Sequence, residues 1–256
     1  MLSFDLRIKK SGVPIVSSEE IDVLAERLVA DFCPNALQTP TEIDIDRFVL
    51  QYLGMKQDFQ YLSHCGVYLG MIVFNDTNQI PIYDPCTEQA EYTSAKAGTV
   101  IIDKSLLEPR QEPRYRFTMG HEGGHAILHT TFFEYDPNQL SIFEPSNAPM
   151  IQCRVDAKHV EKKRPTAWKD FDWMEWQANR MASAILMPRQ MVVELVQTAQ
   201  QIRPQCEQYN YLTSRIQRVF NVSCSAAQFR LIDLGLIPRS AHIDPAMVEF
   251  YRYTVS

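Results

Sequence analysis

The chain has 256 residues, of which 45% are apolar, and a formal net charge of −6 at pH 7. This length and apolar content can bury a substantial core, as one large domain or as one domain with a helical appendage. The acidic balance argues against a nucleic-acid-binding protein, which normally carries a basic excess.

The cysteines and the N-terminal residues indicate a cytoplasmic protein. Six cysteines are scattered without a CxxC pair, which is typical of reduced thiols rather than of a disulfide framework or a zinc ribbon. Residues 1–16 read as a loose arm or an edge strand, and Asp5 and Arg7 argue against a signal peptide. No stretch approaches the roughly 18 apolar residues that a membrane helix needs, so no membrane partner is expected.

Two helices are predicted in the first quarter of the chain. Ser17 or Ser18 can cap the first helix, and Pro34 ends it. The second helix is predicted from Asp44 to Leu53, with Gly54 as its C-terminal cap. We expect both helices to cover the back of a later, histidine-containing helix.

From about Phe59 to Asp103 the apolar residues recur with the period of β-strands. Val67–Phe74 is rich in β-forming residues, a turn follows it, and Ile80–Tyr83 is expected to pair with it. Thr99–Ile102 is a short apolar strand directly before the histidine-containing helix. The pattern therefore predicts a small mixed or antiparallel sheet.

The stretch His121-Glu122-Gly123-Gly124-His125 matches the HExxH pattern of zinc metalloproteases. Positions four apart lie on one face of a helix, so the two histidines can offer their imidazoles to one ion. A catalytic zinc keeps one coordination position open for water, whose pKa it lowers from about 15.7 to about 7. Glu122 is placed to accept the proton of that water and to pass it to a leaving amine.

The segment Arg114–His129 has the spacing of a helix, but Gly120, Gly123 and Gly124 do not favour one. Close approach of another element, or of a substrate, explains three glycines better than helix stability does. The alternative is a chance HExxH match, in which both histidines are ordinary core or surface residues.

A third metal ligand is expected elsewhere. Thr131 stands where a metzincin has its third histidine, and His129 lies two turns from His121, too far to share an ion easily. The best second helix is Trp173–Pro188, where Glu175 and Asn179 lie four apart. Glu175 would bind the metal, and Asn179 would hold a ligand histidine by its second ring nitrogen. Alternatively, Glu175 is an exposed carboxylate in the first turn of its helix.

The segment 130–172 is rich in proline and is predicted to be a lid or specificity loop with short structured pieces. Its basic run Lys162–Arg164 could attract an acidic partner, or it could simply be a solvated face. If Glu175 is not the third ligand, the next candidates in this region are Asp170, Asp172 and His159.

After Pro188 the chain is predicted to be helical. Helices are expected at Gln190–Ile202 and Tyr209–Phe220, with a third ending at Gly235. Their order suggests a helix-turn-helix-like unit, and without a basic recognition face a scaffold or docking role is preferred to DNA binding. We therefore predict a core at residues 1–188 and a helical C-terminal subdomain at residues 189–256.

HEGGHAILH followed by EWQANRMASAILMP resembles the ImmA/IrrE family of metallopeptidases. The similarity also includes Gly98–Asp103, Arg116–Glu122 and Leu234–Leu236, and it covers most of residues 15–238. HExxH is only moderately specific alone, but its combination with ExxAN and LMP is highly specific. The sequence departs from the family pattern in two ways. The connection of 49 residues between His125 and Glu175 is long, and the additional N-terminal DNA-binding domain that many members carry is not expected here.

The resemblance implies that His121, His125 and Glu175 are zinc ligands and that Glu122 is the catalytic acid and base. It implies an α+β fold with a zincin-like, thermolysin-like core, an active-site helix and a helical C-terminal portion. Known members cut or otherwise relieve transcriptional repressors. We therefore predict a zinc endopeptidase whose protein substrate is a repressor or another regulator.

Two alternatives remain at this point. The zinc-containing chain could relieve a repressor by docking without proteolysis, or the metal site could be structural with no open position. In zincin-like folds an extended substrate pairs with an edge of the sheet, and Thr99–Ile102 or Val67–Phe74 could be the strand that binds it. Alternatively, these strands pair only within their own sheet. His64 could donate to an oxyanion or be a plain loop histidine.

Overall fold

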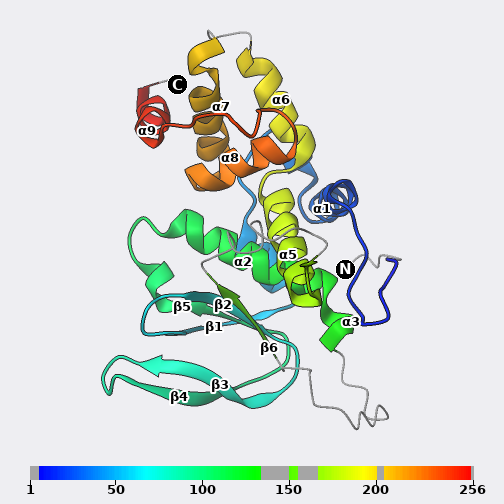
Figure 1. Cartoon of the computed structure of the whole chain (residues 1–256), viewed down its shortest axis with the longest axis vertical. Coiled ribbons are helices and arrows are strands. Elements are labelled where there is room, and N and C mark those ends of the chain that lie inside the picture. Colours follow the sequence, from blue (N-terminus) through cyan, green and yellow to red (C-terminus); the bar gives the residue numbers. More distant parts are fainter. Residues whose placement is uncertain (1–5, 134–149, 155–166, 201–204, 255–256) are drawn as a thin grey trace. The chain divides into compact units, whose positions relative to one another are not determined.

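The computed structural model describes residues 6–133, 150–154, 167–200 and 205–254, which are drawn in colour in Figure 1. The chain divides into two compact units. The first comprises Met1–Ser18 and Asp46–Ala182, and the second comprises Glu19–Ile45 and Ser183–Ser256. The fold is α+β, as predicted, although residues 19–45 cluster with the C-terminal helices rather than with the rest of the expected 1–188 core.

The first unit contains a four-stranded mixed sheet with the order β1-β5-β2-β6. Its strands are β1 (Lys56–Gln60), β2 (Tyr68–Val73), β5 (Thr99–Asp103) and β6 (Met150–Arg154). β1 and β5 are parallel, whereas β2 is antiparallel to both of its neighbours. The predicted strands at 67–74 and 99–102 are therefore present with nearly the predicted bounds.

Neither of these two strands lies at an edge of the sheet. β5 pairs with β1 and β2, and β2 pairs with β5 and β6. Because their backbone groups are used on both sides, the alternative that both strands pair only within the sheet is confirmed, and the alternative that one of them takes the substrate is wrong. Among the described residues, the edges of this sheet are β1 and β6.

A separate hairpin is formed by β3 (Thr77–Asp84) and β4 (Gln89–Ala95). The prediction that Ile80–Tyr83 pairs with the 67–74 strand is therefore wrong. The turn is favoured by Asp84, whose carboxylate accepts hydrogen bonds from the Cys86 amide and the Thr87 hydroxyl, both at 2.9 Å. β4 is mostly polar and exposed, so hydrophobic alternation does not reveal it in the sequence.

The sheet of the first unit is covered on both faces (Figure 1). Met71 and Val73 of β2 pack with Ile101 of β5, and Ile80 of the hairpin covers them. Because side chains alternate along a strand, Gly70 lies on the opposite face of the sheet from Met71. On that face α2 (Glu112–Leu128) packs against the sheet. The predicted histidine-containing helix is therefore present, and η3 (Lys104–Leu107) leads into it from β5.

The helix predicted at 44–53 is present as a π-helix, η2 (Arg47–Tyr52), and Gly54 follows it with φ +72°. η2 packs on α2, as predicted. The hydroxyl of Tyr115 on α2 donates a 2.6 Å hydrogen bond to Asp46, directly before η2, and accepts one from Gln57 at 2.8 Å. Burial, with the help of the Asp46 carboxylate, raises the pKa of Tyr115, so it stays a hydrogen-bond donor at neutral pH.

The first unit is completed by its N-terminal arm, by α3 (Thr130–Phe133) and by α5 (Asp170–Leu186), whose last four residues belong to the second unit. Over its described residues, 6–16, the arm is neither loose nor an edge strand. It is a turn closed by an isolated antiparallel bridge between Ile8 and Pro14. The basic run Lys162–Arg164 and most of the predicted 130–172 lid lie outside the described residues.

The second unit is helical. Its elements are α1 (Ser18–Phe32), η1 (Pro34–Leu37), α6 (Arg189–Gln200), α7 (Gln205–Phe220), α8 (Cys224–Asp233) and α9 (Pro245–Thr254). A buried ion pair of 2.7 Å joins Asp22 of α1 to Arg230 of α8, and Arg230 also donates to the carbonyl of Met187. Ser223 caps α8 by accepting from the Ala226 amide. Among the described residues, no helix combines the length and the apolar character needed to cross a bilayer.

Candidate metal centre

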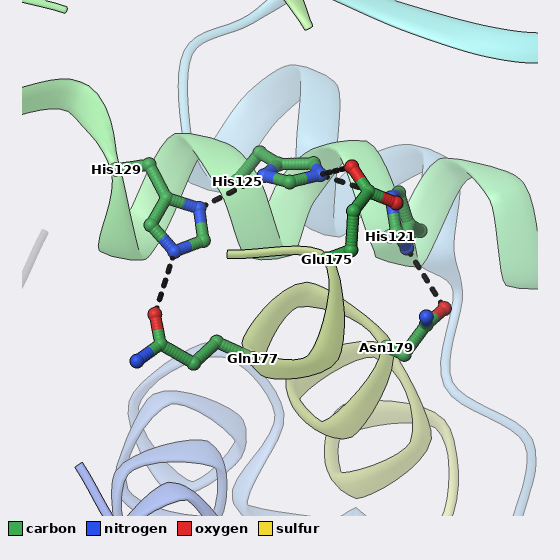
Figure 2. A network of polar contacts seen from close by, with 6 residues as sticks. All are labelled: His121, His125, His129, Glu175, Gln177 and Asn179. Atoms are coloured by element: carbon green, nitrogen blue, oxygen red, sulfur yellow. Dashed lines mark hydrogen bonds and ion pairs between the residues drawn. The ribbon is translucent and has the colours of Figure 1, made fainter. Parts of the chain in front are cut away.

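α2 places His121 and His125 one turn apart, with both imidazoles on the same side of the helix (Figure 2). Their Nε2 atoms are 2.9 Å apart, and the side chains are 1% and 0% exposed. Two buried imidazole nitrogens that face one another in this way need a shared partner, either a proton or a cation.

Glu175 of α5 completes a group of three metal-ligating side chains. Its carboxylate oxygens lie 3.3 Å from Nε2 of His125 and 3.5 Å from Nε2 of His121. Zinc–nitrogen bonds are about 2.0–2.1 Å, so two ligand atoms on a tetrahedral ion are separated by roughly 3.3 Å. The donor set therefore fits zinc. Glu175 is 24% exposed, which leaves this side of the group accessible to solvent.

Two glycines of the motif allow neighbouring elements to approach α2. A Cβ atom at Gly124 would lie 2.9 Å from the carbonyl oxygen of Ala178 on α5, and one at Gly123 would lie 3.1 Å from Val49 on η2. Larger residues at position 124 would push Glu175 away from the histidines. The close approach that the sequence predicts from these glycines is confirmed.

Glu122 lies on the side of α2 that faces β2. It is fully buried, and neither of its carboxylate oxygens makes a hydrogen bond of normal geometry to any of the residues that the structure describes. Burial and the charge of Glu175 raise its pKa well above the ordinary carboxyl value, and the backbone amide of Ile72 opposes this shift. A buried carboxylate without a partner is costly unless a proton or a bound ligand satisfies it.

Each histidine of the motif has a partner at its second ring nitrogen (Figure 2). Nδ1 of His121 is 3.0 Å from Oδ1 of Asn179. Nδ1 of His125 is 2.8 Å from Nδ1 of His129, whose Nε2 is 2.8 Å from Oε1 of Gln177. Neither contact is predicted from the sequence, where the spacing of His129 bears only on whether it can bind the metal. Its four-residue spacing from His125 was the available signal.

The other candidates from the sequence are not in this group. Asp170 pairs with Lys9 at 3.1 Å, and Asp172 accepts a 2.9 Å hydrogen bond from the Lys169 amide. His64 is exposed, and its ring centre lies 6.1 Å from that of Tyr83. His159 lies outside the described residues.

The three histidines are neutral at physiological pH. Burial lowers the pKa of His125 to about 3, and burial together with the nearby His125 lowers that of His121 to about 4. Burial and the same neighbour hold the pKa of His129 well below its usual value. Neutral imidazole is the form that binds a metal, so the site does not lose its ligands to protons near pH 7.

The metal-free chain is expected to become more stable as the pH rises from 5.5 to 6.5. Below pH 6.5, the ordinary pKa of histidine, His121, His125 and His129 take up protons in the unfolded state but stay neutral in the folded state. Glu122 has the opposite effect, because above pH 4.5, the ordinary pKa of its carboxyl, it keeps a proton in the folded state and loses it on unfolding. The unfolded state therefore binds more protons, and the free energy of unfolding should rise by roughly 1–2 kcal/mol over this interval. Urea unfolding of the metal-free chain at both pH values measures the change.

The variant Glu122→Gln is the control for this prediction. It removes the opposing carboxyl, so its free energy of unfolding should rise more steeply with pH than that of the unmodified chain. A free energy that falls between pH 5.5 and 6.5 would contradict the assignment of neutral, buried histidines.

Gly70→Ala is expected to damage the position of Glu122. The new Cβ would lie 2.6 Å from Cγ2 of Thr118 and 2.7 Å from Oε1 of Glu122. Such overpacking costs about 1–3 kcal/mol of stability. Adding Thr118→Ser removes the first clash and keeps the hydroxyl, which donates to the Arg114 carbonyl. Thermal unfolding should show recovered stability in the double variant, while any hydrolytic activity that depends on Glu122 should stay low. Recovery of both the stability and the activity would show that Gly70 is needed only for packing and not for the position of Glu122.

Residues 159–232 match the family model of the IrrE N-terminal-like domain, a peptidase family. The matched region contains Glu175 and Asn179, and the HExxH helix precedes it. No curated protein matches the chain. The match confirms the ImmA/IrrE resemblance over residues 159–232.

Proposed function

We propose that the chain is a zinc-dependent endopeptidase with a zincin-like core. The observation that carries this proposal is the convergence of two imidazole nitrogens and one carboxylate beside the buried carboxylate of Glu122, which makes no hydrogen bond of normal geometry to the described residues. The family match supports a metal-dependent peptidase. Nitrogen ligands with a single carboxylate favour zinc over magnesium or calcium, which prefer oxygen ligands alone.

In this proposal His121, His125 and Glu175 hold the ion. Zinc, when bound, polarises a peptide carbonyl and makes a water molecule acidic enough to react at neutral pH. Glu122 accepts the proton of the attacking water and later gives it to the leaving amine. Burial raises the pKa of Glu122, which helps the carboxyl to hold the proton between the two steps.

The peptide backbone is proposed to lie along β6, the sheet edge next to β2. β2 carries Gly70, which contacts Glu122, and α2 contacts both β2 and β6. An extended peptide added there would continue the sheet and lie beside α2. The substrate is proposed to be a regulatory protein, such as a transcriptional repressor, by similarity to known ImmA/IrrE members.

A cytoplasmic location is part of the same proposal. The cysteines whose side chains the structure describes, Cys33, Cys65, Cys86 and Cys224, are all free thiols. Free thiols are typical of reducing compartments, where intracellular regulators are found.

A peptide library tests the proposed activity without knowledge of the natural substrate. Zinc-loaded chain is incubated with peptides from a digested proteome whose amino termini have been blocked, and new amino termini are identified by mass spectrometry. Cleavage at a consistent motif, lost with a chelator and restored by zinc, is expected. No zinc-dependent new termini, either in the library or in a lysate of folded proteins, would overturn the proposal.

A further inference from the structure

A continuous row of hydrogen bonds leads from His125 to the N-terminal arm. It runs from Nδ1 of His125 to Nδ1 of His129 at 2.8 Å, and from Nε2 of His129 to Oε1 of Gln177 at 2.8 Å (Figure 2). Nε2 of Gln177 then donates to the backbone carbonyl of Pro14 at 2.8 Å. The three side chains are buried, with at most 1% exposed. Bulk water therefore cannot substitute for a lost partner.

The last member of this row fixes the direction of every bond in it. A backbone carbonyl can only accept, so Gln177 must donate its amide N–H to Pro14 and present its oxygen to His129. A neutral imidazole has one donor nitrogen and one acceptor nitrogen. Nε2 of His129 therefore carries the hydrogen, its Nδ1 accepts, and Nδ1 of His125 must donate.

The consequence for His125 is a single permitted tautomer. With its hydrogen on Nδ1, its Nε2 carries the lone pair that faces His121 and Glu175. The reverse arrangement would turn the oxygen of Gln177 toward the carbonyl of Pro14, which places two acceptors at hydrogen-bonding distance without a proton between them.

We propose that His129 and Gln177 are positioning residues that fix the tautomer and the ring orientation of His125 for metal binding. This inference rests on the proposed zinc site. The N-terminal arm is then part of the site, since the Pro14 carbonyl sets the direction of the row. Outer contacts of this kind hold a ligand histidine in its binding geometry.

The arm is itself held in place by three contacts. Lys9 pairs with Asp170 at 3.1 Å, and its ammonium lies 5.3 Å from the centre of the Trp173 ring. Gly12 has φ +93° and packs on Phe132, where a Cβ atom would lie 3.3 Å from the Phe132 Cα. The carbonyl of Pro14 therefore comes from a defined turn.

His121 offers a comparison within the same site. Its Nδ1 is hydrogen-bonded to the amide of Asn179, which is half-buried, so water can take over part of that role. The partner of His125 is fully buried, and its loss leaves an unsatisfied donor. Loss of His129 is therefore expected to weaken metal binding more than loss of Asn179.

The test uses the full chain and zinc alone, in competition with a chelator. His129→Phe should weaken zinc binding about 10–100-fold, which is the usual effect of losing an outer contact of a ligand histidine. His129→Asn can place an amide oxygen close to the position of Nδ1 and should recover most of the affinity. Thr130→Val, which removes a neighbouring hydroxyl bond to the Ala126 carbonyl, should leave zinc binding unchanged.

A second readout separates positioning from general destabilisation. With cobalt(II) in place of zinc, the Nδ1 protons of both ligand histidines should give shifted NMR signals, and that of His125 should exchange slowly with water. In His129→Phe this signal should exchange rapidly. If His129→Phe fails to fold, Gln177→Leu should produce a smaller change of the same kind, because it acts one hydrogen bond further away.

The outcomes are distinguishable. If the unmodified chain binds no zinc, the proposed function itself fails. If the unmodified chain binds zinc, and the folded His129→Phe variant keeps the same affinity and the same slowly exchanging signal, the zinc site stands and the positioning role is overturned. Failure of His129→Asn to improve on His129→Phe would also count against it.

Discussion

Replacing Glu122 by glutamine is expected to reduce the turnover number about 10²–10⁴-fold, which is the usual contribution of a general acid and base. Glutamine has nearly the same size but cannot take up a proton from water. Zinc affinity should be unchanged, because Glu122 lies outside the group of ligand atoms formed by the histidines and Glu175. Steady-state kinetics on a peptide identified from the library, with zinc content measured in parallel, check this prediction.

The same variant separates proteolysis from docking. If the chain relieves a repressor by cutting it, Glu122→Gln should abolish both the cleavage and the relief. If relief persists without cleavage, the chain acts by binding. Because Glu122 is buried without a normal hydrogen bond, the neutral substitution should not destabilise the fold. Turnover retained by a stable variant would show that another group moves the proton.

Glu175→Ala is expected to weaken zinc binding by more than the ~10–100-fold that the loss of an outer contact costs. It removes the only carboxylate of the three-ligand group and leaves two imidazoles. Two neutral nitrogen ligands neither complete a typical zinc site nor offset the charge of the ion. A competition titration with a chelator at pH 7 measures the affinity.

Asp172→Asn is the matched control for this variant. Asp172 lies on the same helix and is an alternative third ligand by sequence, and asparagine keeps an oxygen for the Lys169 amide. Its zinc affinity should equal that of the unmodified chain. Equal affinity in Glu175→Ala, or a loss in Asp172→Asn, would move the third ligand away from Glu175.

The features that sequence predicts well are those set by local periodicity. A spacing of four residues places His121 beside His125 and Glu175 beside Asn179, whatever the rest of the chain does. Gly123 and Gly124 indicate close packing of a neighbouring element, because glycine is unfavourable in an isolated helix. The strands at β2 and β5 follow from their apolar, β-branched residues.

The features that sequence misses depend on contacts between distant segments. Strand order is one of them, since nothing within Thr99–Asp103 shows that it has neighbours on both sides. The polar β4 strand is another, because it is defined by its partner and not by its own pattern. The role of His129 becomes visible only when Gln177 and the Pro14 carbonyl are placed beside it.

The most direct test of the account is the zinc content of the purified full chain after reconstitution and removal of excess metal. The geometry predicts about one zinc per chain, since one catalytic ion takes two histidines and one glutamate. Retention of that zinc should depend on Glu175. A chain that folds normally and binds no zinc would contradict the account, because His121, His125 and Glu175 would then form a group without a metal to hold.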